Sequence, residues 1–158
     1  MRLLVLSFII AILPLTAIFG QNANNNIAIT ANTGLNFTCN SISTIENDQT
    51  LSNAITVTVK SRNNSCSIYA RISSFLGPSG FSTSTYPIQL DYVSTNSNKY
   101  ANLITAPLTL TSVNQRLFTQ TSTTSTFNYY YNLIFKATNY DFPVGNYNFT
   151  ITFTMTQP

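Results

Sequence analysis

Few residues in this chain could do catalytic chemistry, and their spacing does not build a site. Histidine is absent from the 158 residues, which removes the most common general base and the most common metal ligand. Of the four acidic residues, only Glu46 and Asp48 are close in sequence. Because they lie in the polar stretch ENDQT, we interpret them as loop residues and not as a paired acid and base. We therefore expect no enzymatic activity, no cofactor and no bound metal.

Three consecutive tyrosines are a second candidate, as a surface on which a sugar ring could stack. The strict alternation around them predicts a strand in which Tyr129 and Tyr131 face the core and Tyr130 faces outward. We favour this packing role. The absence of tryptophan further weakens the interpretation as a carbohydrate-binding module.

The amino-terminal segment has the composition of a signal peptide. Arg2 precedes an unbroken apolar run, Leu3 to Leu13, and Pro14 and small or apolar residues follow it, as in a charged region, an apolar region and a cleavage zone. We expect residues 1–20 to be removed, and an uncleaved membrane anchor is the alternative. The mature chain would then have no membrane span. It would reach the cell surface or the extracellular space, through the periplasm if the source is Gram-negative.

Cys39 and Cys66 are the only cysteines of the chain. Because an exported protein meets an oxidising compartment, we expect them to form a disulfide; two unrelated buried thiols are the alternative. Alternation places each cysteine with apolar residues on the inward face of its strand, so both sulfur atoms should point toward the core.

The surface must be polar without being strongly charged. Charged residues make up 7% of the chain, and the formal net charge is +3. Lys and Arg do not cluster with aromatic residues, so we expect no nucleic-acid partner. Asn36, Asn63 and Asn148 each begin an Asn-X-Ser/Thr sequon, which matters only in a eukaryotic source.

Alternation of apolar and polar residues recurs along the chain, and no long helical period is present. The alternating stretches are residues 27–39, 55–59, 66–72, 88–92, 127–137 and 147–155. This pattern predicts one domain, an all-β, immunoglobulin-like antiparallel β-sandwich of about 7–9 strands without helices; a closed barrel is the alternative. Residues 21–34 would be an amino-terminal arm or the first strand, and residues 35–158 would be the sandwich.

The order of these features resembles that of chaperone–usher pilins and of the related spore-coat-U-like secreted subunits. The shared features are an alternating amino-terminal arm, a cysteine on the first strand (FTC, Cys39), a second strand ending near the other cysteine (AITVTVKSRNNSC, Cys66), and a last strand entered through PVGNY. In that family the subunit is an incomplete immunoglobulin-like sandwich. The alternating amino-terminal extension of the next subunit fills its groove.

The resemblance implies two sets of site residues. The donor-strand candidates are Ile27, Ile29 and Ala31. The candidates for the acceptor groove and assembly strand are Gly145, Tyr147, Phe149, Ile151, Phe153 and Met155. The last strand would also contact a periplasmic chaperone. Alternatively, the arm is simply the first strand of a self-sufficient domain.

Two functions follow from these observations. The first is a non-enzymatic, exported structural subunit of a surface fibre, pilus or coat, which associates with itself or with related subunits by β-strand complementation. The second is a self-contained secreted adhesion or ligand-binding domain, whose ligand is a glycan or a protein. The first predicts concentration-dependent polymers, and the second predicts a monomer at high concentration.

Overall fold

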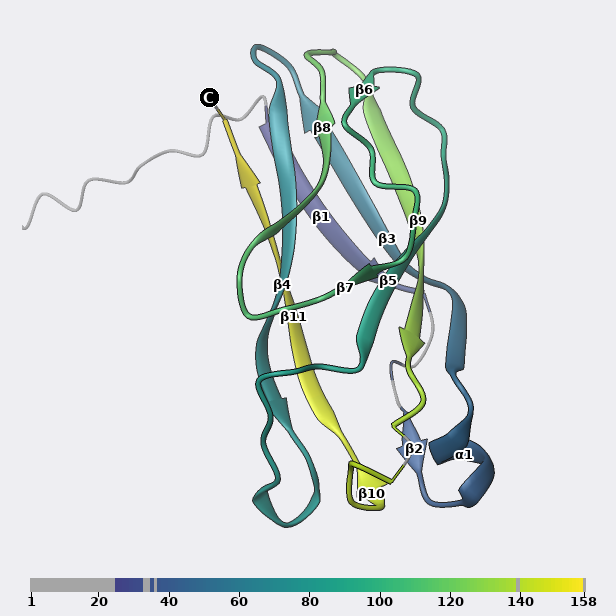
Figure 1. The fold of residues 1–158 in the computed structure, drawn as a ribbon. Coiled ribbons are helices and arrows are strands. Elements are labelled where there is room, and N and C mark those ends of the chain that lie inside the picture. The colour runs from purple at the N-terminus through teal and green to yellow at the C-terminus, as the bar shows by residue number, and fades with distance from the viewer. Residues whose placement is uncertain (1–24, 33–34, 36, 139, 158) are drawn as a thin grey trace, which may run out of the picture.

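The computed structural model describes residues 25–32, 35, 37–138 and 140–157, and it shows an antiparallel β-sandwich (Figure 1). The expected all-β, immunoglobulin-like fold is therefore confirmed. The described residues form eleven strands instead of seven to nine, because four short strands of two residues each add to the longer ones. The expected signal peptide, residues 1–20, lies outside the described residues.

The larger sheet has five strands in the order β1-β3-β9-β5-β7. Its strands are β1 (Asn25–Ala31), β3 (Gln49–Ser61), β9 (Thr126–Phe135), β5 (Ile88–Thr95) and β7 (Leu108–Thr109). The facing sheet has the order β11-β4-β8-β6. Its strands are β11 (Asn148–Thr156), β4 (Cys66–Leu76), β8 (Gln115–Gln120) and β6 (Tyr100–Ala101). A small pair, β10 (Gly145–Asn146) and β2 (Thr38–Cys39), and the 3-10 helix η1 (Pro78–Gly80) complete the lower end of the molecule.

Six strands follow the order of an immunoglobulin sandwich, whereas β8 and β6, which extend the sheet beside β4, have no counterpart in it. Such a sandwich has strands A, B, E and D in one sheet and C, F and G in the other. Here β1, β3, β9 and β5 follow A, B, E and D, whereas β4 and β11 follow C and F. Within the described residues no strand takes the position of G, so β11 is the outer strand of its sheet.

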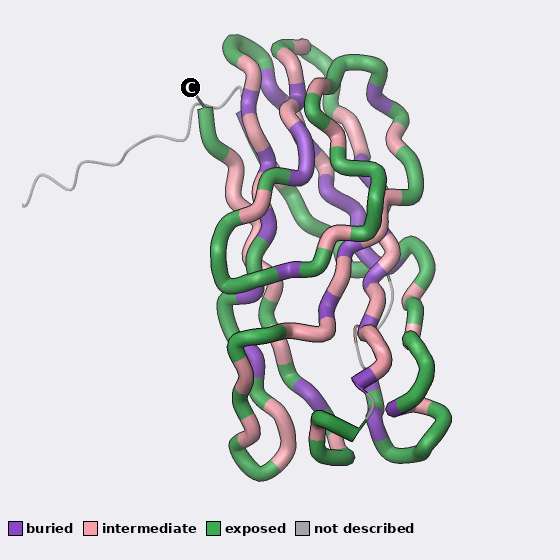
Figure 2. The backbone as a smooth tube through the Cα atoms, in the orientation of Figure 1, coloured by how far each residue is buried: buried purple, intermediate pink, exposed green. Residues whose placement is uncertain are grey.

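The core lies between the two sheets, and the period-two pattern selects its residues. Ile55, Val57 and Val59 of β3 are buried as expected. They belong to one core cluster with buried residues of β9 in the same sheet and of β4 in the facing sheet. Figure 2 shows the buried segments of the chain. The ring of Tyr129 stacks on that of Phe118 with centroids 3.7 Å apart. Tyr129 and Tyr131 therefore serve the core, and Tyr130 is half-buried on the outer side.

A short helix lies where the sequence pattern predicts none. In helix α1 (Ile42–Glu46), the Ser41 hydroxyl accepts a hydrogen bond from the Thr44 amide, and the Thr44 hydroxyl accepts one from the Ser41 amide. This reciprocal capping satisfies amides that would otherwise lack partners. The helix separates β2 from β3. The stretch 27–39 is also not one continuous strand, because β1 ends at Ala31 and Thr38–Cys39 pair with β10 instead.

The expected disulfide is wrong, because Cys39 and Cys66 are free, buried thiols. Cys39 lies opposite Gly145 in the β2–β10 pair. Gly145 lies close to Pro78, because a Cβ placed on Gly145 would be only 2.8 Å from the Pro78 side chain. Since Pro78 is just beyond the end of β4, Cys39 is near that end of the strand. Cys66 begins β4, an 11-residue strand. At about 3.3 Å per residue, the two cysteines are on the order of 30 Å apart, whereas a disulfide needs Cα atoms within about 7 Å. Burial raises the pKa of both thiols, so they stay protonated.

Candidate functional site

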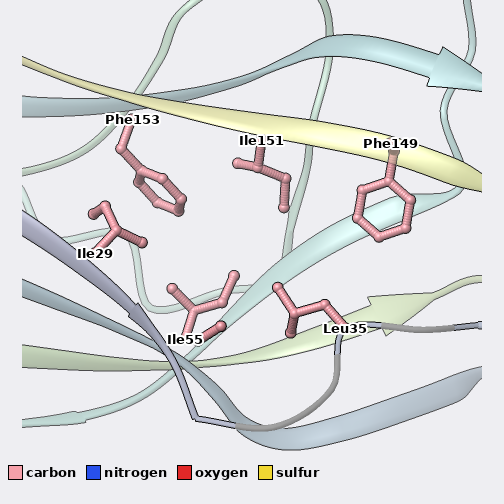
Figure 3. A pocket seen from close by; sticks show the side chains of 7 residues that line it. Ile29, Leu35, Ile55, Phe149, Ile151 and Phe153 are labelled. Carbon is pink, nitrogen blue, oxygen red and sulfur yellow. The ribbon is translucent and has the colours of Figure 1, made fainter.

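An apolar groove runs between β1 and β11, the outer strands of the two sheets on the same side of the sandwich (Figure 3). The groove encloses about 120 Å³. Its lining is entirely apolar and comes from both sheets and from the segment that follows β1: Ile29, Ala31, Leu35, Ile55, Phe149, Ile151 and Phe153. The side chains of β11 and β1 point toward one another across it.

Of the lining residues, only Ile55 is fully buried, unlike those of the rest of the core. Along β11 all the inward-facing residues, Phe149 to Met155, are partly exposed, and Ile29 of β1 is 43% exposed. The inward-facing residues of the neighbouring strand β4, such as Ile68 and Ile72, are at most 6% exposed. Leaving apolar surface in water costs about 25 cal/mol per Å². Among the described residues, the inner faces of β1 and β11 are therefore only partly covered along this side.

Of the usual protections against strand pairing, the edges beside the groove lack charge and proline and have one irregularity, in β11. Native proteins block exposed edges with charged residues, proline or a covering segment. Neither β1 nor β11 contains a charged residue or a proline. β11 has one register shift, between Thr150 and Ile151. Within the described part of the chain, each of the two strands pairs with one neighbour, and no described strand lies along its other edge.

The structure brings some of the predicted site residues together and separates others. Phe149, Ile151 and Phe153 of the predicted acceptor set line the groove. Met155 is half-buried and packs against the core without lining the groove. Of the predicted donor residues, Ile29 and Ala31 also line it, and Ile27 packs against the core from the same strand. In addition, the predicted donor strand β1 is paired along its whole length with β3 of its own chain, from Asn25 opposite Ser61 to Ala31 opposite Ile55.

Gly145 and Tyr147 lie outside the groove and stabilise the lower end of the sandwich. Tyr147 is 5% exposed, and its ring contacts four other aromatic rings: Phe75, Phe81, Phe135 and Phe142. Its hydroxyl donates to the carbonyl of Pro143. Tyr147 therefore stabilises the turn that leads into β11, and Gly145 lies in β10, just before it.

Two groove residues, Leu35 and Ile55, are absent from the predicted site. Their inward alternation is visible in the sequence, but only the folded chain places them under β11. Leu35 comes from the segment after β1, and Ile55 lies opposite Ala31.

None of the seven side chains that line the groove is ionisable. The carboxylates lie elsewhere. Asp48 forms an ion pair with Lys136 and accepts a hydrogen bond of 2.8 Å from the Ala137 amide. Both contacts, with that of Lys136 the larger, lower the pKa of Asp48. Among the described residues, no group of three or more His, Cys, Asp or Glu side chains is placed to hold a metal ion.

Comparisons with protein-family models, with curated proteins and with solved structures return no match to this chain. In the part of the chain that the structure describes, no helix has both the length and the apolar character needed to cross a membrane.

Proposed function

We propose that this protein is an exported structural subunit of a surface fibre, pilus or coat, in which a β-strand from a neighbouring subunit fills the groove between β1 and β11. The observation that carries this proposal is the half-exposed apolar groove between two strand edges that lack charge and proline. A strand added to the edge of β11 would form main-chain hydrogen bonds, and its alternate side chains would enter the groove.

Stable association requires several side chains of the incoming strand to be buried in the groove together. Burying one large apolar side chain contributes about 1.5–3 kcal/mol, whereas association costs at least 4 kcal/mol, roughly, in lost freedom of motion. One side chain is therefore too few. The groove is bounded by Phe149, Ile151 and Phe153 along five residues of β11, which is long enough to face two or three alternate residues of an incoming strand.

The proposed donor residues Ile27, Ile29 and Ala31 belong to β1, so donation to another subunit requires β1 to leave β3. In such a polymer the groove of each acceptor would be bounded by its β3 and β11, and the donated β1 would take the place of the acceptor's own β1. The seven pairs of this antiparallel ladder would have to separate first. Assembly by this route is an exchange reaction, and it should be slow. A periplasmic chaperone that covers the edge of β11 before assembly fits the same requirement, because an uncovered edge promotes aggregation.

Matched lysine substitutions test this proposal. Ile29→Lys and Ile151→Lys place a charge in the groove, whereas Ala28→Lys and Thr152→Lys place the same charge on the outer faces of the same two strands. Sedimentation velocity at rising concentration should show polymers for the unmodified chain and for the two outer variants, and monomers for the two groove variants. Circular dichroism checks that all four variants fold. A monodisperse unmodified chain at high concentration, or equal behaviour of groove and outer variants, would overturn the proposal.

The second candidate is a self-contained secreted adhesion or ligand-binding domain. The pairing of β1 with β3 of its own chain favours it, because that pairing completes the larger sheet without a second subunit. This candidate predicts a monomer at every concentration in the same experiment.

A further inference from the structure

The outer face of the β11-β4-β8 sheet brings two arginines together beside a tyrosine. Tyr69 of β4 lies opposite Arg116 of β8 on one side and Thr154 of β11 on the other. Arg71 lies two residues further along β4 and on the same outer face as Tyr69. The residues that alternate with these two, Ile68, Ala70 and Ile72, are buried on the inner face. Side chains directly opposite one another have Cβ atoms about 4.5–5.5 Å apart, and diagonal neighbours remain within reach of long side chains. One ligand can therefore contact all three residues.

The positive charge of this face is not neutralised. Arg71 and Arg116 are both exposed, and within the described residues the only ion pair joins Lys136 to Asp48. No acidic residue of the chain lies in a strand of this sheet. The four acidic residues belong to α1, to the loop before β3, to β5 and to the loop after β9: Glu46, Asp48, Asp91 and Asp141.

The surroundings of the arginines are rich in hydroxyl groups. Thr152 lies opposite Arg71, and the hydroxyls of Ser67 and Thr119, on neighbouring strands, are 3.0 Å apart. The guanidinium group binds carboxylate and sulfate groups through paired hydrogen bonds. A tyrosine ring offers a flat apolar surface with a polar end. A sheet face with these three kinds of group suits a sugar polymer that carries negative charges.

We propose that Tyr69, Arg71 and Arg116 form a binding site for an acidic polysaccharide. The two guanidinium groups bind its carboxylate or sulfate groups, and the Tyr69 ring packs on a sugar ring. The site goes beyond the proposed assembly function and is independent of it, because it lies on the outer face of the sheet whose inner face lines the groove.

Titration with defined polymers tests this site. The probes are polygalacturonate, which carries carboxylates, dextran sulfate, which carries sulfates, and neutral dextran. A single-stranded DNA oligonucleotide tests whether a nucleic acid binds instead. We expect the purified protein to bind at least one of the two acidic polysaccharides, more weakly as salt is added, and not to bind neutral dextran. The tighter of the two identifies the preferred anionic group.

Two double variants separate a specific site from general charge attraction. Arg71→Gln with Arg116→Gln should weaken binding at least tenfold. Lys60→Gln with Lys99→Gln removes the same charge from the other sheet and from the loop before β6, and it should change binding less than twofold. Tyr69→Ala should weaken binding while the net charge stays unchanged. Thermal unfolding checks the fold of each variant. Equal losses in the two double variants, no binding to either acidic polysaccharide, or tighter binding to the DNA would overturn the proposal.

Discussion

At the residue scale, Gly145 lies where β10 contacts the start of η1, in a backbone conformation that favours glycine. Its φ is +144°, and a Cβ at this position would lie 2.8 Å from the Cβ of Pro78. We expect Gly145→Ala to lower the free energy of unfolding by about 1–3 kcal/mol, measured by urea denaturation. Gly80→Ala is the matched control, because Gly80 also has a positive φ (+75°) but nothing lies within 4 Å of its added Cβ. Equal losses for both variants would contradict the steric argument.

A buried tyrosine makes the stability of the fold sensitive to alkaline pH. Burial raises the pKa of Tyr129 from 10.0 to about 12, and its hydroxyl donates to Gln120 at 2.7 Å. The folded state therefore favours the protonated form. This contribution to stability is fully present below pH 10 and is lost between about pH 10 and 12. The unfolding free energy should fall over this window in urea titrations, and less steeply for Tyr129→Phe. Identical slopes for the two proteins would contradict this assignment.

At the element scale, the two candidate functions differ in the role of β1. In a fibre subunit β1 is the donor strand, whereas in a self-contained domain it stays in the larger sheet of its own chain. Deleting residues 21–33 removes β1 and leaves β4, β9 and most of β3 packed. We expect a folded monomer of lower unfolding free energy, because Val57 and Val59 lose their neighbours on β1, and we expect no polymers in sedimentation experiments. Deleting residues 21–24 alone retains β1 and is the control. Polymerisation of the longer deletion at the normal extent would show that β1 is not the donor strand.

The elements differ in how far the sequence predicts them. The alternation of Ile55, Val57 and Val59 predicts the inward face of β3 because burial on one face of a sheet requires period two. Two features depend on more than local pattern. Helix α1 is a single capped turn and has no apolar period, and the distance between Cys39 and Cys66 depends on the direction in which β4 runs.

The candidate site is also predictable only in part, because some of its features depend on the tertiary structure and not on the local sequence pattern. The inward residues of β11, such as Phe149 and Ile151, follow from alternation. Their partial exposure does not, because it depends on which strand lies at the edge of each sheet. The pairing of Tyr69 with Arg116 joins residues far apart in the sequence. No short motif predicts such a pair.

At the scale of the whole molecule, the described core is closed between β3, β4, β5 and β9 and partly open along β11. The closed part of the core contains side chains at 0–2% exposure, such as those of Ile68, Leu90 and Leu133, whereas β11 has no fully buried residue. This asymmetry places the partly exposed apolar groove and the two uncharged strands β1 and β11 on one side of the fold. A monomer with such a side should be less stable than the same sandwich with an added strand.

Hydrogen–deuterium exchange of the assembled and the monomeric protein tests the central claim most directly. The monomer is the Ile29→Lys variant, and Ala28→Lys is the assembled control. Because an added strand would bond to the free edge of β11, amides in residues 148–156 should exchange at least tenfold more slowly in the polymer than in the monomer. Amides of β8, in the interior of the same sheet, should change little. Unchanged exchange in residues 148–156 of a polymer that is protected elsewhere would contradict strand addition at the β1–β11 groove.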